Sequence, residues 1–210
     1  MEKNGIFKQW QFTKGRVEAF SDAVFAIVMT LLVLDLKVPH IEHPGDMQEI
    51  KAALVGVAPL LFSWAVSFFF VALIWVHHHN IMNMSTKSDY GAIWINIIML
   101  FFICLLPFPT ALMAEYPSYP LFVMLWGLTF SASTFSLTWF YYYNVKNYLD
   151  EGRYDKKSVI KNVRLSIFAG PTIYLAAAFL AWASVYISFV LYAFTPLLYI
   201  LPLDKERRKE

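Results

Sequence analysis

Charged residues are scarce in this 210-residue chain, at 15% of the total, against about 25% in soluble globular domains. Cysteine is nearly missing: Cys104 is the only one, which excludes an internal disulfide and a cysteine-based metal motif. Hydrophobic residues instead make up 59% of the chain and aromatic residues 18%. A soluble domain of this size lacks the interior volume to bury so much apolar mass. The composition therefore predicts an all-α, polytopic membrane protein.

Several functional motifs are also missing. The sequence has no Thr-Val-Gly-Tyr-Gly loop, the segment whose carbonyls form the filter of many potassium channels. It has no phosphate-binding glycine loop, nucleophile elbow or His-Glu-x-x-His motif. We therefore predict that the protein is not an enzyme and that it needs no cofactor, metal or nucleic acid.

Six apolar segments are present, and each is close to the length of about 20 residues that crosses a bilayer as a helix. A single helix over 165–203 would be about 57 Å long, which exceeds the ~30 Å hydrocarbon core, so two helices in a hairpin are predicted there. Residues 1–210 are thus expected to form a single six-helix transmembrane domain. The segments run Val17–Val38, Ala52–His79, Ala92–Met113, Tyr119–Tyr143, Leu165–Ala183 and Ser184–Leu203.

The distribution of basic residues predicts the orientation of these segments. Of the 17 lysines and arginines, all but Lys37 and Lys51 fall at the two ends of the chain or in the second and fourth loops. Because cytoplasmic loops are enriched in lysine and arginine, both termini are predicted to be cytoplasmic. That placement requires an even number of spans, in agreement with six.

The first segment contains polar residues at an unusual depth. The pair Ser21-Asp22 begins a few residues beyond Arg16, and Asp22 lies six residues, or about 9 Å, farther along a helix. A carboxylate at that depth is costly unless it is paired or hydrogen-bonded. We expect Arg16, Ser21 and Asp22 to join a polar network that locks this helix or relays a proton. A charge that snorkels to the interface is the alternative.

Three adjacent histidines end the second segment. His77, His78 and His79 fan over about 200° of a helix, so they cannot all bind one metal ion. His77 or His78 is expected to donate or accept a hydrogen bond at the cytoplasmic end, in the direction of Asp22. An interfacial histidine with no special task is the alternative.

The first segment also carries an apolar stripe. Ile27, Leu31 and Leu34 follow the i, i+4, i+7 spacing of one helix face, and Thr30 borders this stripe. Ser21 and Asp22 point away from it. A stripe of this kind is typical of ordinary helix packing. In a symmetric oligomer it could instead line an axis and form a constriction that gates by dewetting.

Acidic residues gather around the first outer loop. They are Asp35, Glu42, Asp46 and Glu49. Repeated around an oligomer axis, they would raise the local concentration of cations. A solvated acidic loop fits the same pattern equally well.

The run Arg16-x-x-x-Phe20-Ser21-Asp22, followed by Ala23-Val24-Phe25-Ala26-Ile27, resembles the first-helix signature of the transmembrane-protein-175 family of cation channels. The six-span length matches across nearly the whole chain. One Phe-Ser-Asp motif implies the bacterial single-repeat type, a homotetramer in the plasma membrane. The resemblance implies potassium conduction through a pore lined by the first helix of each subunit.

The same resemblance assigns roles to residues of the first helix. Ile27 matches the apolar residue at the narrowest point, and Thr30 matches a hydroxyl position associated with selectivity. Leu31 and Leu34 would continue the pore face. Arg16, Ser21 and Asp22 match the polar network, which His77 or His78 would join. The acidic loop, separately from the resemblance, predicts that Asp35 attracts cations at the outer mouth.

Two other functions remain open from the sequence. One is a proton-coupled secondary transporter that uses Asp22 and a histidine as its relay. Against it, the sequence shows no pair of broken helices in corresponding halves. The other is a membrane enzyme that uses His77–His79 as ligands, which would require bound metal and a nearby carboxylate.

Overall fold

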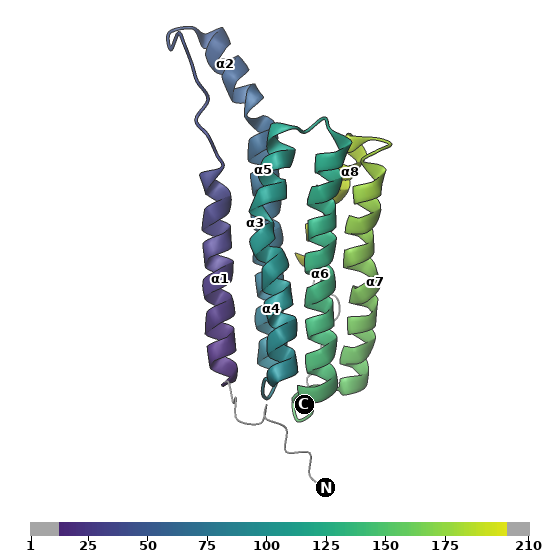
Figure 1. The fold of residues 1–210 in the computed structure, drawn as a ribbon. Coiled ribbons are helices and arrows are strands. Elements are labelled where there is room, and N and C mark those ends of the chain that lie inside the picture. Colours follow the sequence, from purple (N-terminus) through teal and green to yellow (C-terminus); the bar gives the residue numbers. More distant parts are fainter. Residues whose placement is uncertain (1–12, 201–210) are drawn as a thin grey trace.

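The computed structural model describes the backbone of residues 13–200 and the side chains of all of these except 162–169 and 197–200. Within this range the regular elements are helices, apart from one isolated bridge between Ser85 and Leu149. The helices stand nearly upright and side by side as a bundle (Figure 1). They are α1 (Lys14–Leu34), α2 (Met47–Gly56), α3 (Ala58–Met84), α4 (Tyr90–Leu105), α5 (Pro107–Glu115), α6 (Pro120–Tyr148), α7 (Lys156–Leu180) and α8 (Val185–Ile200).

Four stretches in the described part of the chain are long and apolar enough to cross a membrane: Lys14–Leu34, Met47–Met84, Tyr90–Glu115 and Pro120–Tyr148. Two of them are nearly continuous helix pairs. The first pair breaks at Val57 and the second at Leu106, immediately before Pro107. Proline cannot donate the helical hydrogen bond, which explains the second break. Shorter apolar helices follow at Gly170–Leu180 and Val185–Pro196.

The predicted segments map onto these helices with shifted ends. The largest shift is in α7, which begins at Lys156, where the Asp155 carboxylate caps it by accepting a hydrogen bond from the Ser158 backbone. Its first turns are polar and lie outside the apolar window. The predicted hairpin is present, since only a short turn separates Leu180 from Val185. The chain ends that carried part of the charge argument, 1–12 and 201–210, lie outside the described residues.

Aromatic packing ties α3, α6, α7 and α8 together. Phe70 of α3 stacks on Phe130 of α6 with ring centroids 4.1 Å apart, and Tyr174 of α7 meets both rings edge-on. Tyr192 of α8 donates a hydrogen bond to the Val123 carbonyl of α6. A β-carbon at Gly127 would overlap the Tyr192 hydroxyl, so glycine is required for this close approach. The four helices therefore share one aromatic core.

A second cluster holds α3, α5 and α6 through polar groups. The hydroxyls of Ser67 and Thr110 lie 2.8 Å apart, and the Trp126 indole donates to Ser67 at 3.0 Å. All three side chains are buried. Polar side chains commonly bond across helices in this way inside membranes. α1 packs outside these clusters, against α3 and α4 at one edge of the bundle (Figure 1).

Asp89 begins α4 and joins it to the end of α6. Its carboxylate accepts hydrogen bonds from the Ala92 backbone at 2.9 Å and from the Tyr143 hydroxyl at 2.8 Å. Burial alone would raise the pKa of Asp89, but the bonds from Ala92, Tyr148 and Tyr143 outweigh it and hold the pKa below its usual value. The ionised form of Asp89 therefore stabilises the fold.

We expect Asp89→Ala to lower the free energy of unfolding by about 1 kcal/mol through loss of the helix cap. Asp89→Asn keeps a capping side chain but removes the charge. The pKa of Asp89 in the folded state lies below the ordinary value of 3.8. The charge therefore stabilises the fold above that pH, and this stabilisation is lost as the pH falls through the folded-state pKa. Thermal unfolding in detergent should show the wild-type advantage over Asp89→Asn at neutral pH and its disappearance in acid. An advantage that did not change with pH would contradict the role of the charge.

Candidate functional site

The two faces of α1 have opposite environments. Val17, Ser21, Phe25, Val28 and Leu32 are buried against the bundle. The other face is bare: Ile27 is 56% exposed, Leu31 44% and Leu34 72%. Large apolar side chains that stay exposed along one helix at the edge of a bundle indicate contact with lipid, with another chain or with the path of a solute.

Thr30 lies on the exposed face between Ile27 and Leu31. Its hydroxyl donates a 2.8 Å hydrogen bond to the Ile27 carbonyl. Since the proton is used within the helix, the oxygen lone pairs are free to face outward. Thr30 thus offers a ligand oxygen for a cation on an otherwise apolar face.

The buried face of α1 is held by a chain of hydrogen bonds. Ser21 donates to the Val17 carbonyl at 2.9 Å, and the Asn96 amide of α4 donates to the Ser21 hydroxyl at 2.9 Å. The Asn96 carbonyl oxygen accepts from Nε2 of His78 on α3 at 3.0 Å. Because the Asn96 carbonyl oxygen can only accept, His78 carries its proton on Nε2 in this series of hydrogen bonds. Nδ1 of His78 is buried and has no hydrogen-bond partner among the described residues.

A second set of contacts joins α1 to α3 through side chains on the more exposed side of α1. The Trp75 indole donates to the Asp22 carboxylate at 2.8 Å, which satisfies the charge at depth in α1. Trp75 also stacks on His79, whose Nδ1 lies 3.5 Å from the Glu18 carboxylate. Glu18, Ser21 and Asp22 of α1 are therefore tied to α3 and α4, and the apolar stripe is left facing outward.

The residues of the predicted polar network are distributed differently among these contacts. Ser21 and His78 belong to the same series of hydrogen bonds through Asn96. Asp22 belongs to the neighbouring set of contacts with Trp75. Arg16 is exposed, and no ion pair joins it to Asp22 within residues 13–200. His77 donates to the Leu73 carbonyl and lines a cavity with Thr138 and Tyr174, on the side of α3 that faces α6 and α7.

The sequence did not predict that Asn96, Trp75 and the Glu18–His79 pair take part in the contacts that hold α1. Asn96 carried a signal, since it is a lone amide within the apolar run Trp94–Cys104. Trp75 resembles an ordinary interfacial tryptophan, and its partner lies 53 positions away in the chain. Among the described residues no group of three or more histidines, cysteines or acids could hold a metal ion.

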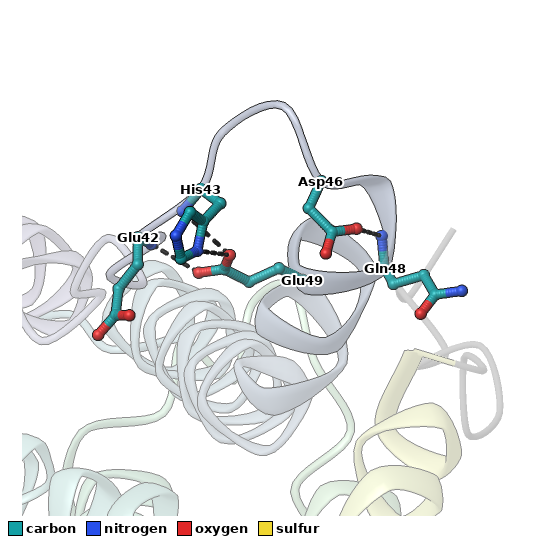
Figure 2. A network of polar contacts seen from close by, with 5 residues as sticks. All are labelled: Glu42, His43, Asp46, Gln48 and Glu49. Atoms are coloured by element: carbon teal, nitrogen blue, oxygen red, sulfur yellow. Dashed lines mark hydrogen bonds and ion pairs between the residues drawn. The ribbon is translucent and has the colours of Figure 1, made fainter.

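The C-terminal end of α1 leads into the acidic loop. Asp35 is the C-cap of α1 and is half-buried. Beyond it the Glu49 carboxylate accepts hydrogen bonds from the backbones of Glu42 and His43, and Asp46 caps α2 by accepting from Gln48 (Figure 2). The acidic residues thus structure the loop that follows the exposed face of α1.

The apolar helices and the polar locks between them define a polytopic helical membrane protein. A sequence profile of the family described as "Endosomal/lysosomal potassium channel TMEM175" matches residues 16–107. Potassium channel Cha6605_3372 of Chamaesiphon minutus is 32% identical over 188 residues, which cover 85% of this chain and 89% of that protein. The chain belongs to the TMEM175 family. Its relatives are ion channels, which confirms that it is not an enzyme.

Other relatives match over less of their length. Potassium channel B446_29190 of Streptomyces collinus is 41% identical over 102 residues, so the match spans about half of it, 48%. The mouse "Endosomal/lysosomal proton channel TMEM175" is 38% identical over 112 residues, which cover 22% of that longer protein. The region matched by the family profile, residues 16–107, contains nearly all of α1 and its partners Trp75, His78 and Asn96.

A solved structure shares the fold. The crystal structure described as a lysosomal potassium-selective channel TMEM175 homologue from Chamaesiphon minutus superposes with a TM-score of 0.74 at 30% sequence identity. It covers 90% of this chain and 96% of that one. The whole helical arrangement, and not only the first helices, is therefore that of the family.

Proposed function

We propose that this protein is a potassium-conducting channel of a bacterial plasma membrane. Each protomer contributes six transmembrane helices with both ends on the cytoplasmic side, and four protomers surround one axis. The observation that carries the proposal is the bare face of α1, with Ile27, Leu31 and Leu34 exposed on a helix whose opposite face is locked into the bundle. Relatives named potassium channels support the choice of ion.

In the proposed pore, four copies of α1 face the axis. Ile27 forms the narrowest ring, Leu31 and Leu34 extend the apolar wall, and Asp35 attracts cations at the outer mouth. An apolar ring of this kind gates by dewetting and needs no carbonyl filter. The outward-facing oxygen of Thr30 compensates an ion for the water that it sheds near Ile27. The permeant ion is potassium, and no cofactor takes part.

The contacts on the other face of α1 have a mechanical role in this proposal. A pore helix must keep its rotation about its own axis, because a turn of 100° would replace Ile27 with a neighbour. The bonds from Asn96 to Ser21 and from Trp75 to Asp22 oppose such a rotation. Asp22 is thereby committed to holding the helix, which argues against its use as a transporter relay.

Flux from liposomes tests the proposal. Purified protein is reconstituted into vesicles loaded with potassium, and efflux is followed with a potassium electrode after dilution into sodium and into a large impermeant cation. We expect rapid efflux that rises in proportion to the gradient and needs no pH difference. Efflux no faster than from protein-free vesicles would refute a channel. Saturable transport that stops without a proton gradient would favour the transporter.

Protons are measured in the same vesicles with a trapped pH dye, because vertebrate relatives are named proton channels. The apolar ring predicts that potassium carries most of the current at neutral pH.

A further inference from the structure

The outer end of the molecule carries a projecting element, residues 35–56, which we call the outer cap. It consists of the loop after α1 and the helix α2. In Figure 1 α2 rises beyond the other helices and leans over the α1 edge of the bundle. No residue of α2 is buried. Met47 is 62% exposed, Leu54 58% and Val55 73%, so the cap presents an apolar surface with nothing over it in the single chain.

Lipid tails cannot cover this surface. The 27 residues of α3 already give a helix about 40 Å long, and the hydrocarbon core is only about 30 Å thick. The histidines near the end of α3 mark its inner, polar part, so the hydrocarbon surrounds the residues before them. α2 therefore lies above the acyl chains. At that level Leu54 and Val55 can be buried away from water only by contact with protein.

The cap is held in one shape. The Glu49 carboxylate accepts hydrogen bonds from the backbone amides of Glu42 at 2.6 Å and His43 at 3.0 Å, and His43 Nδ1 lies 3.2 Å from it. The Asp46 carboxylate caps α2 through Gln48 at 2.8 Å. These contacts fasten the loop to the helix (Figure 2). A surface that is ordered beforehand loses less entropy when it binds a partner.

Opposite charges stand apart on this rigid surface. Lys51 on α2 and Glu42 on the loop are both exposed, and neither side chain is in an ion pair within residues 13–200. Figure 2 shows the Glu42 carboxylate turned away from the contacts around Glu49. A surface with separate, unpaired charges of both signs is complementary to a rotated copy of itself. Head-to-tail contacts close into a ring when the rotation between neighbouring copies closes on itself.

We propose that the outer cap docks on the outer cap of the next copy of this chain, so that the caps form a collar above the channel mouth. Leu54 and Val55 of one copy are covered by the neighbouring cap, and Lys51 pairs with Glu42 of the neighbouring copy. This inference rests on the oligomer of the proposed function. It assigns a binding surface to residues that lie outside the membrane and outside the conducting face.

A charge swap tests the pairing. Lys51→Glu and Glu42→Lys should each reduce the share of protein that survives as an oligomer in detergent, by at least about fivefold. The double variant K51E/E42K should restore it to near the wild-type share, as read by size exclusion with light scattering. Glu115→Lys is the matched control, since Glu115 is also exposed but is the last residue of α5. It should have no effect alone and should not rescue Lys51→Glu. Failure of the double variant to recover, or equal rescue by Glu115→Lys, would overturn the pairing.

Cross-linking tests the contact independently of charge. Cys104→Ser removes the only cysteine, and Val55→Cys then places a single thiol on the cap. In proteoliposomes a short bismaleimide should join copies through Val55→Cys. It should leave monomers with the control Tyr186→Cys, which is 77% exposed at the start of α8. Equal cross-linking of the two variants would overturn the docking.

Potassium flux is measured on the same vesicles to separate the two proposals. Potassium flux without cross-linking through Val55→Cys would refute the proposed collar and leave the proposed channel standing. Cross-linking through Val55→Cys with no potassium flux from the wild type would support the contact between caps and refute the proposed channel.

Discussion

Ile27→Ala is expected to raise potassium flux several-fold and to reduce the preference for potassium over sodium. In the proposed tetrameric pore, the substitution would widen the ring at Ile27 and remove apolar surface from all four subunits at one level. Water then enters the constriction more readily, and each ~1.4 kcal/mol taken off the barrier speeds passage about tenfold. Single-channel recording in planar bilayers measures both the conductance and the reversal potential under mixed ions.

Ile187→Ala is the matched control for this experiment. Ile187 on α8 is also a half-exposed isoleucine, at 48% against 56% for Ile27, but it lies away from α1. Its truncation should leave conductance and selectivity unchanged. If Ile27→Ala also changed nothing while the protein conducted, the narrowest point would lie elsewhere on the path.

Thr30 separates two explanations of selectivity in the same recordings. Thr30→Val keeps the shape of the side chain and removes the oxygen. In Ile27→Ala the Thr30 oxygen remains, so a potassium preference that survives the wider ring but is lost when Thr30→Val is added belongs to the hydroxyl. Comparing the two single variants with the double therefore divides selectivity between an apolar constriction and an oxygen ligand.

The fold was largely predictable because membrane burial acts on long, uniform stretches of sequence. Hydropathy located α1, α3, α4, α6, α7 and α8. It missed α2 as a separate helix and the polar first turns of α7. Both contain charged and polar residues, so hydropathy alone does not mark where they begin. The caps Asp46 and Asp155 were local signals for these starts.

The site was predictable only for the residues within α1. The Ser21-Asp22 pair stands out because polar groups are expensive at that depth, and the stripe from Ile27 to Leu34 follows helical spacing. Their partners come from α3 and α4, more than 50 positions away, and pairing at that range leaves no periodic mark in one sequence. The sequence therefore indicated that α1 must be anchored but not that Asn96 and Trp75 anchor it.

Asn96→Leu is expected to have the second large effect, on the stability of the protomer and on conduction together. Asn96 links α4 to Ser21 of α1 and to His78 of α3. Without it the buried His78 Nε2–H has no acceptor, which costs about 1–3 kcal/mol. α1 also loses one of the bonds that fix its rotation. Thermal unfolding in detergent should shift downward, and potassium flux should fall at temperatures where the protein is still folded.

A double-variant cycle separates this network from simple damage to the core. His78 packs between Phe25 and Phe140, so His78→Phe keeps an aromatic ring there and removes the polar atoms. If the cost of Asn96→Leu comes from the orphaned imidazole, the double variant N96L/H78F should be more stable than the sum of the single effects predicts. Ser136→Ala is the control, because that buried hydroxyl donates only to a carbonyl of its own helix. Strictly additive losses in N96L/H78F would mean that Asn96 and His78 act separately, and that α1 owes its orientation to the Asp22–Trp75 contact instead.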